Sequence, residues 1–366
     1  VLTFLAPDFS LTGKIVYAYI TYTAMTMIYT AINVPYAALM GVITPNAMER
    51  TVISSYRFVG VFTALFIVQA AFLSIVNTYF ADNEALGYRT VMIGVSALSV
   101  ILFFITFLTT KERVAPPKEQ KTVLRRDLAE LFKNKPWLFV AGATVFQLVL
   151  ISMRNAAIMY YFKYYIGREN LALFGKEIPW SGVSAFMLFG TVLTILGAIS
   201  TKWFTTFLNK GRAYVLFMFL TAIFVAAVIF IKPDQIELLF LFQALASFSM
   251  GPLSVLQWSI YTDTADYGEW KFSHRATGLL MAASLFALKL GLALGSAILG
   301  WLMNAYGFVA NVAQSELSLT GIRMVMSVYP AIAAICAIVI MIFYPLTNKK
   351  MEEIEIDLSA RRETEK

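Results

Sequence analysis

The sequence predicts an all-α membrane protein with its helices arranged in two bundles, and three observations support this fold class. Hydrophobic residues make up 59% of the 366 residues and charged residues only 14%, whereas soluble domains carry about a quarter charged residues. The mean hydropathy is +0.71. Apolar segments recur that reach the roughly 20 residues needed to cross a bilayer. Most of these helices must therefore face lipid or one another.

Nine segments are predicted to span the membrane, and residues 1–7 before them resemble the last turns of a helix. We expect that the start of this helix is missing, because the apolar stretch VLTFLAP is too short to span and has no basic region before it. The nine predicted spans are residues 14–40, 51–76, 90–108, 137–166, 180–208, 213–231, 236–264, 277–306 and 322–344.

A basic segment, residues 111–136, separates three predicted spans from six. The positive-inside rule places this segment on the cytoplasmic side, and counting spans from it places the C-terminus there too. Two missing helices and the incomplete first one would restore six and six, which is the major facilitator architecture. We therefore expect helices I, II and most of III to be missing. The predicted parts are an N-terminal bundle (1–110), a cytoplasmic loop (111–136), a C-terminal bundle (137–347) and a cytoplasmic tail (348–366).

Three cations lie deep in predicted spans, namely Arg57, Arg154 and Lys289. No aspartate or glutamate lies at a comparable depth, and an unpaired charge in apolar surroundings is costly. An anionic ligand or missing segments must supply the negative charge. Asn33 lies at about the depth of Arg57 on the preceding helix, so the two side chains are expected to be within reach of each other.

Two turns with charges of both signs occupy matching places in the two halves. Such turns suit salt-bridge gates that break and form again as the halves move, although charged side chains at helix ends also reach the interface without any function. The predicted cytoplasmic gate comprises Glu49, Arg50, Asp263, Asp266, Tyr267, Glu269 and Arg275.

Aromatic rings with polar edges suit a sugar pocket, and Trp258 beside Gln257 is one candidate, although packing explains any single ring as well. The single cysteine, Cys336, and the single histidine, His274, exclude a disulfide and a multi-histidine metal centre. No nucleophile–base or metal constellation is apparent, so we do not expect an enzyme. The basic segment lacks the aromatic or structured module of a nucleic-acid site.

Several motifs resemble those of the glycoside–pentoside–hexuronide:cation symporters. They are YTAINVPYAAL followed by ER and YRF, then TDTADYGEWKFSHR and ALKLG, in order along essentially the whole chain. The resemblance implies twelve helices in two bundles, with this chain beginning near the end of helix III. It also implies principal cation-site acids on helices I and II.

The resemblance implies roles for individual residues. Thr30 would lie at the cation site, Asn33 and Arg57 would contact the sugar, and Lys289 would lie near both sites. The end of helix X and the cytoplasmic gate would be matched by Asp263, Asp266, Tyr267 and Glu269, with Arg275 alongside. Asn33 replaces a carboxylate of the family and Ala37 a tryptophan, so the substrate can differ. Arg154 also departs from the family and could bind the carboxylate of a uronic acid.

The leading functional hypothesis is secondary active symport of a glycoside, pentoside or hexuronide with Na⁺ or H⁺ by alternating access. We expect a multi-pass monomer in the cytoplasmic membrane, with lipid and sugar as partners, and no cofactor or nucleic acid. Two alternatives stay open. One is transport of an anionic or lysophospholipid-like substrate on the same fold, which the deep cations favour. The other is a non-transporting membrane receptor or scaffold.

Overall fold

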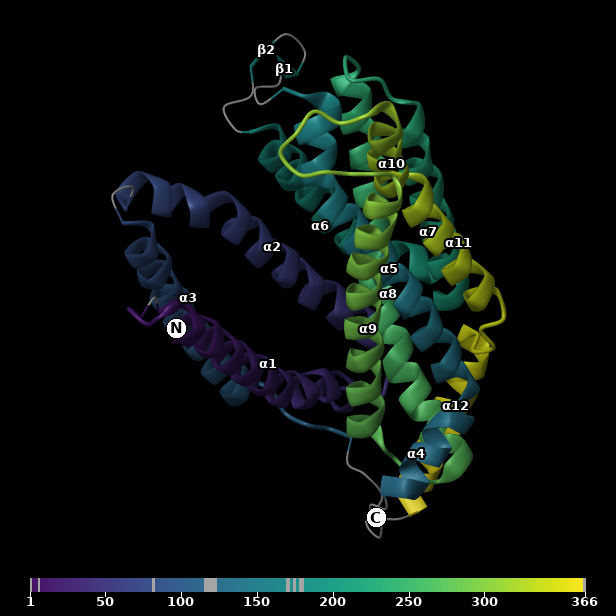
Figure 1. Cartoon of the computed structure of the whole chain (residues 1–366). Coiled ribbons are helices and arrows are strands. Elements are labelled where there is room, and N and C mark those ends of the chain that lie inside the picture. The colour runs from purple at the N-terminus through teal and green to yellow at the C-terminus, as the bar shows by residue number, and fades with distance from the viewer. Residues whose placement is uncertain are drawn as a thin grey trace. The chain divides into compact units, whose positions relative to one another are not determined.

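The protein is described from a computed structural model that covers residues 2–5, 7–80, 83–114, 124–168, 172–173, 176–177 and 181–364 (Figure 1). Residues 115–123 of the predicted cytoplasmic loop and residue 180 of a predicted span lie outside the described residues. The first helical elements are η1 (Leu2–Phe4), α1 (Leu11–Val42), α2 (Ala47–Tyr79), α3 (Glu84–Thr109), α4 (Leu124–Lys133) and α5 (Lys135–Tyr160), which continues into the π-helical turn η2 (Tyr161–Ile166).

The remaining helices are α6 (Gly182–Phe207), α7 (Lys210–Ala227) with the 3₁₀ turn η3 (Val228–Phe230), α8 (Ile236–Phe272), α9 (Thr277–Ala305), α10 (Glu316–Met326), α11 (Val328–Ile342) and α12 (Asn348–Thr364). Between η2 and α6, the two-residue strands β1 (Ala172–Leu173) and β2 (Lys176–Glu177) pair antiparallel, with Ala172 opposite Glu177. Helices therefore dominate the described part of the chain, as predicted.

Nine helical segments among the described residues are long and apolar enough to cross a membrane, which confirms the nine predicted spans. Each observed segment overlaps one predicted span. The largest difference at a helix end is in α8, which continues to Phe272, well past the predicted end at residue 264. Asp263, Asp266 and Glu269 thus lie on a helix and not in a turn.

The chain divides into two compact units, which are described separately. The first contains Val1–Pro45 and Ala64–Ala115, and the second contains Asn46–Thr63 and Pro116–Lys366. The first half of α2 thus belongs with the helices that follow the predicted loop. The predicted boundaries of the two bundles, residues 1–110 and 137–347, stay predictions.

The core of the second unit depends on close helix–helix contacts through small residues. Gly197 on α6 faces α8, and a Cβ added to it would lie 2.0 Å from the Phe248 carbonyl oxygen. Gly251 on α8 faces α6, and a Cβ added to it would lie 2.3 Å from the Thr194 carbonyl oxygen. Small residues let helix backbones approach in this way, and the gain in van der Waals contact drives association in lipid. This packing fixes α8, which carries most of the residues discussed below.

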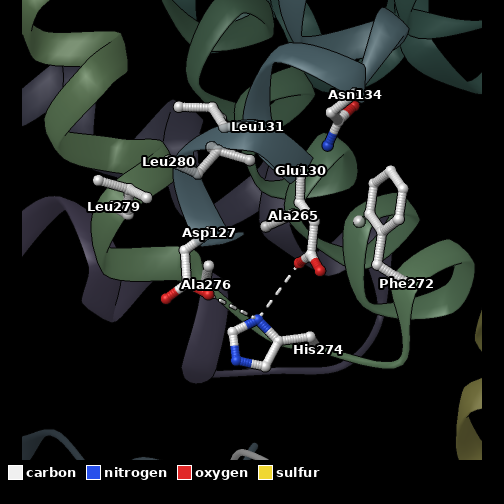
Figure 2. Close-up of a pocket in the computed structure, with 11 residues that line it drawn as sticks. Asp127, Glu130, Leu131, Asn134, Ala265, Phe272, His274, Ala276, Leu279 and Leu280 are labelled. Atoms are coloured by element: carbon white, nitrogen blue, oxygen red, sulfur yellow. Dashed lines mark ion pairs between the residues drawn. The ribbon is translucent and has the colours of Figure 1, made fainter. Parts of the chain in front are cut away.

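The short helix α4 lies within the predicted cytoplasmic loop, where no helix was predicted. The side chain of Asn134, which follows α4, accepts a hydrogen bond from the Trp137 amide at 3.2 Å and so caps α5. Its Nδ2 donates to the Thr264 carbonyl of α8 at 2.8 Å. Asp127 and Glu130 of α4 present their carboxylates to His274, which lies in the turn between α8 and α9 (Figure 2).

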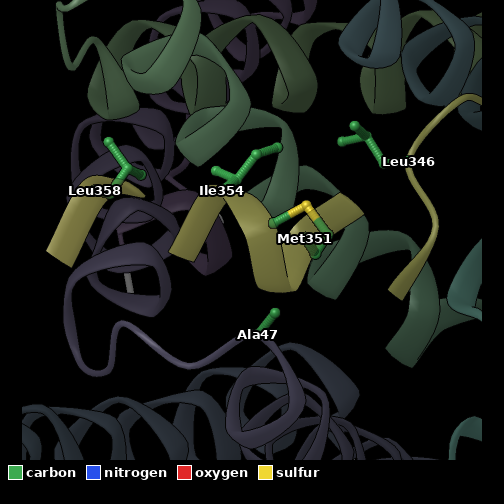
Figure 3. Close-up of a cluster of buried hydrophobic side chains, with 5 residues drawn as sticks. All are labelled: Ala47, Leu346, Met351, Ile354 and Leu358. Carbon is green, nitrogen blue, oxygen red and sulfur yellow. The ribbon is translucent and has the colours of Figure 1, made fainter. Parts of the chain in front are cut away.

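The helix α12 lies in the predicted tail, where again no helix was predicted. Its Met351, Ile354 and Leu358 recur at spacings of three and four and therefore share one face. They form a buried cluster with Ala47 and Leu346 (Figure 3). The partly buried rings of Tyr267, Trp270 and Tyr344 pack against this cluster. Trp270 also donates a hydrogen bond from Nε1 to Asp357 Oδ2 at 2.9 Å. The tail thus packs against the start of α2 and the end of α8.

Candidate functional site

A cluster of buried ion pairs joins the start of α2 to the end of α8. Arg50 of α2 pairs with Asp266 and lies 3.8 Å from Asp263, and all three side chains are at most 3% exposed. Lys210 at the start of α7 donates to Asp263 Oδ2 at 2.7 Å and to the carbonyl oxygen of Ala47 at 2.9 Å. One lysine therefore ties three helices together.

The turn after α8 closes the same cluster. Arg275 pairs with Glu269 and, at 3.0 Å, with Asp266, so Asp266 lies between two arginines. Although burial disfavours the charged guanidinium, the nearby carboxylates of Asp266 and Glu269 outweigh it and raise the pKa of Arg275. We refer to these three cations and three carboxylates as the charge cluster: Arg50, Lys210, Arg275, Asp263, Asp266 and Glu269.

The structure brings together five of the seven residues predicted for the gate. The other two lie outside the charge cluster: Glu49 has an exposed side chain, and Tyr267 packs against the α12 cluster. Sequence reasoning missed Lys210. It also missed Glu355 of α12, whose carboxylate accepts a hydrogen bond from the Ala47 amide at 2.6 Å. The basic turn at residues 210–212 was the available signal for Lys210.

Beyond the charge cluster, hydroxyl groups connect the first half of α2 to α6 and α8. The hydroxyls of Thr51 and Ser259 lie 2.9 Å apart, Ser54 donates to the Val255 carbonyl at 2.9 Å, and Ser55 donates to a carbonyl of α6 at 2.6 Å. All of these hydroxyls are buried. This contact is therefore polar along its length, unlike the glycine-mediated packing of α6 on α8.

One turn further along α2, Arg57 stacks on an aromatic ring. Its guanidinium carbon lies 4.6 Å from the centroid of the Trp258 ring on α8 and 5.9 Å from that of Phe58. Trp258 is 7% exposed. Guanidinium groups are attracted to tryptophan faces, most strongly where water is excluded. The structure thus joins two of the residues predicted to bind substrate.

Arg154 lies inside the second unit, on α5, and is only 4% exposed. Its guanidinium donates to the side-chain oxygen of Gln243 on α8, while its Nε has no hydrogen-bond partner in the part of the chain that the structure describes. None of the ion pairs among the described residues involves Arg154. A buried guanidinium held by a neutral amide retains its full positive charge, which could attract an anionic group.

The other predicted site residues are separated between the two units. Thr30 and Asn33 are on α1 in the first unit, where their side chains donate to the carbonyls of Thr26 and Tyr29 at 2.8 and 2.9 Å. Lys289, in the middle of α9, is partly buried and belongs to the second unit with Arg57. The predicted pocket that would combine these residues stays a prediction.

Comparisons with known proteins show which family this chain belongs to. The profile of the family described as MFS/sugar transport protein matches residues 1–348. The inner membrane symporter YicJ of Escherichia coli is 33% identical over 97% of this chain and 75% of its own length. The isoprimeverose transporter of Lactiplantibacillus pentosus is 29% identical over 97% of this chain and 71% of its own.

Among solved structures, the E. coli fucose:proton symporter FucP superposes with a TM-score of 0.59 at 14% identity, covering 92% of this chain and 78% of that one. This likeness confirms the major facilitator fold. The family match begins at the first residue, so it gives no support to the expectation that helices I, II and most of III are missing.

Proposed function

Because this chain belongs to the glycoside–pentoside–hexuronide:cation symporter family of the major facilitator superfamily, we propose that it moves a glycoside, pentoside or hexuronide across the cell membrane together with Na⁺ or H⁺. The chain is a multi-pass membrane protein and its relatives are transporters, not enzymes. The family match over residues 1–348 is the observation that carries this proposal. No cofactor is needed, since the cation gradient supplies the driving force.

We propose that Arg57 and Trp258 form part of the sugar site. A tryptophan face offers the apolar surface on which a sugar ring stacks, and the guanidinium beside it supplies donors to hydroxyl or carboxylate oxygens. The contact at 4.6 Å between the two supports this assignment. Asn33 would hydrogen-bond sugar hydroxyls, Thr30 would contribute to the cation site, and Lys289 would couple the two sites.

The charge cluster is proposed as the cytoplasmic gate. A carboxylate or guanidinium separated from its partner in a buried position is costly, so such pairs hold a closed state until the separated charges reach water. Two features support the gate: its alternating charges, and the hydroxyl contacts of α2 next to it. We also place the segment 111–136 and the C-terminus on the cytoplasmic side and expect a monomer.

Arg154 supports a more specific proposal about substrate class. Its buried guanidinium has a neutral amide as its hydrogen-bond partner, so an acidic substrate would supply the missing negative charge. Among the possible substrates a hexuronide fits this requirement better than a neutral glycoside. The same observation favours a second candidate, transport of another anionic molecule such as a lysophospholipid.

Uptake measurements in cells that express the protein test these proposals. Labelled glucuronides, neutral glycosides and lysophospholipids are offered under imposed Na⁺ and pH gradients. We expect uptake of an acidic sugar that depends on one of the two gradients. Arg57→Gln should abolish uptake, and Arg154→Gln should reduce uptake of acidic sugars more than of neutral ones. The matched control is Arg168→Gln, which removes an exposed arginine and should leave uptake unchanged.

Each result separates the candidates. Uptake that ignores both gradients would contradict cation coupling, and uptake of a lysophospholipid but not of sugars would favour the second candidate. Equal loss of acidic and neutral sugar uptake in Arg154→Gln would remove the argument for an anionic substrate. Unchanged uptake in Arg57→Gln would remove that residue from the sugar site.

A further inference from the structure

Two carboxylates and the chain's one histidine converge outside the charge cluster. Asp127 and Glu130 are three residues apart on α4 and therefore lie on the same face of that helix. The Nδ1 atom of His274 lies 3.4 Å from Asp127 Oδ1 and 3.4 Å from Glu130 Oε2 (Figure 2). The three side chains join α4 to the turn between α8 and α9.

His274 and Asp127 are buried, Glu130 is partly buried, and three polar atoms of the first two lack a hydrogen-bond partner within the described part of the chain. The side chains of His274 and Asp127 are 6% and 4% exposed, and that of Glu130 is 20% exposed. Among the described residues, no hydrogen-bond partner is found for either ring nitrogen of His274 or for Asp127 Oδ1. Buried polar atoms without partners are unfavourable and call for an unseen water or ion. The adjoining cavity of about 30 Å³ has room for one small occupant.

The spacing of the three groups fits a metal ion. One ligand atom from each residue can be chosen so that all three lie within 4.8 Å of one another. Two ligand atoms bound tetrahedrally to zinc at about 2.0–2.1 Å are about 3.3–3.4 Å apart, which matches both measured separations from Nδ1. An imidazole among the ligands favours zinc-like ions over Mg²⁺ or Ca²⁺. Three protein ligands leave a fourth position for water.

Other charges near the three groups permit a cation. Arg126 Nε lies 3.7 Å from Asp127 Oδ1 and 3.6 Å from Glu130 Oε1, but its side chain is 48% exposed and can extend into solvent. Arg275, next to His274, is turned toward Asp266 and Glu269 in the charge cluster. The two carboxylates around His274 thus leave a net negative site for a divalent ion.

We propose that Asp127, Glu130 and His274 bind a divalent transition-metal ion of the zinc class. The ion would fasten α4, in the segment that connects the two groups of spans, to the turn that also carries Arg275. This site goes beyond the transport function, since it needs neither a sugar nor a coupling cation. Its test is a binding measurement, so its failure and that of the proposed transport are distinguishable.

The experiment measures zinc in the purified full chain in detergent. The protein is purified without a polyhistidine tag, because a tag would bind zinc itself and obscure binding by His274, the single histidine of the sequence. After treatment with a chelator, Zn²⁺ and, separately, Mg²⁺ are titrated in and the bound metal is counted. Co²⁺ is then substituted as a spectroscopic probe of tetrahedral nitrogen and oxygen ligands. The variants are His274→Gln and Asp127→Asn, and the matched control is Glu352→Gln, which removes an exposed carboxylate of α12.

We expect one Zn²⁺ per chain, no binding of Mg²⁺ under the same conditions, and a melting temperature that rises with zinc concentration. His274→Gln should weaken zinc binding by more than the roughly 10–100-fold caused by loss of a second-shell partner, and Glu352→Gln should bind as the unaltered protein does. A chain that takes up no stoichiometric zinc would overturn the proposal. Equal zinc binding by His274→Gln would overturn it as well. The zinc content of the unaltered chain is measured without any substitution. A variant that fails to fold therefore does not protect the proposal from that result.

Discussion

The pair between Arg50 and Asp266 allows a quantitative test of the charge cluster. The perturbation is a double-mutant cycle with Arg50→Gln, Asp266→Asn and both together. Asp266→Asn keeps the size of the side chain while it removes the charge, whereas Arg50→Gln removes the guanidinium and shortens the side chain. The cycle therefore isolates the energy of the pair from the effects of each substitution alone.

The expected magnitude follows from burial and from the remaining partners. The two side chains are 1% and 3% exposed, and removal of one partner from a buried pair costs about 3–5 kcal/mol. Asp266 keeps Arg275 at 3.0 Å when Arg50 is neutralised, so the single substitutions should fall at the lower end, about 3 kcal/mol. The coupling energy between the two sites should then be about 1–3 kcal/mol.

The assay is equilibrium unfolding in mixed micelles with increasing denaturing detergent, followed by circular dichroism. The exposed pair Lys350–Glu353 provides a matched control, because its charged atoms are 2.7 Å apart but its side chains are 34% and 56% exposed. Its cycle should give no more than about 0.5 kcal/mol. A coupling energy for Arg50 and Asp266 as small as that of the control would refute the reasoning that burial makes this pair strong.

Three further predictions concern packing and pH. Gly251→Ala should destabilise by about 1–3 kcal/mol, since its Cβ would lie 2.3 Å from a backbone oxygen of α6, whereas Gly300→Ala, with nothing within 4 Å, should leave the melting temperature nearly unchanged. Ile354→Ala, at a fully buried position, should cost about 2–4 kcal/mol of docking energy and speed amide exchange in α12, while Ile356→Ala, 64% exposed, should not. Burial raises the pKa of Glu355, although the Ala47 amide and Arg50 oppose this shift. The stability that Glu355 contributes is therefore complete below the ordinary carboxyl pKa and is lost as the pH rises through the raised pKa. The melting temperature of Glu355→Gln relative to the unaltered protein should therefore rise with pH, and a constant difference would contradict this sign.

The membrane spans could be predicted from sequence because the free energy of placing an apolar segment in lipid depends little on which helices are its neighbours. The end of α8 was not, since Asp263, Asp266 and Glu269 resemble a polar turn until their partners are known. Three cations from three other parts of the chain neutralise these carboxylates, which lets the helix continue to Phe272. Local sequence contains the charges but not the pairing.

The predictions about the candidate site divide in the same way. Arg50 pairs with Asp263 and Asp266, so the structure joins the two charged segments, and the gate role itself stays a proposal. The amphipathic spacing of Met351, Ile354 and Leu358 was an available signal for α12. Asp127 and Glu130 gave no such signal, because only the fold brings them beside His274.

The hydroxyl contacts of α2 have a consequence for how easily that helix can separate from α8. Thr51 already contacts the carbonyl of Ala47, one turn back on its own helix, at 3.3 Å while it also lies 2.9 Å from Ser259. Serine and threonine on any helix have this option, because the carbonyl four residues earlier is within reach of the hydroxyl. A hydroxyl that loses its acceptor across the contact can therefore donate to a backbone carbonyl of its own helix instead. Separation would break hydrogen bonds without leaving a donor unsatisfied, so α2 can leave this surface at a lower cost than if its donors were left without acceptors.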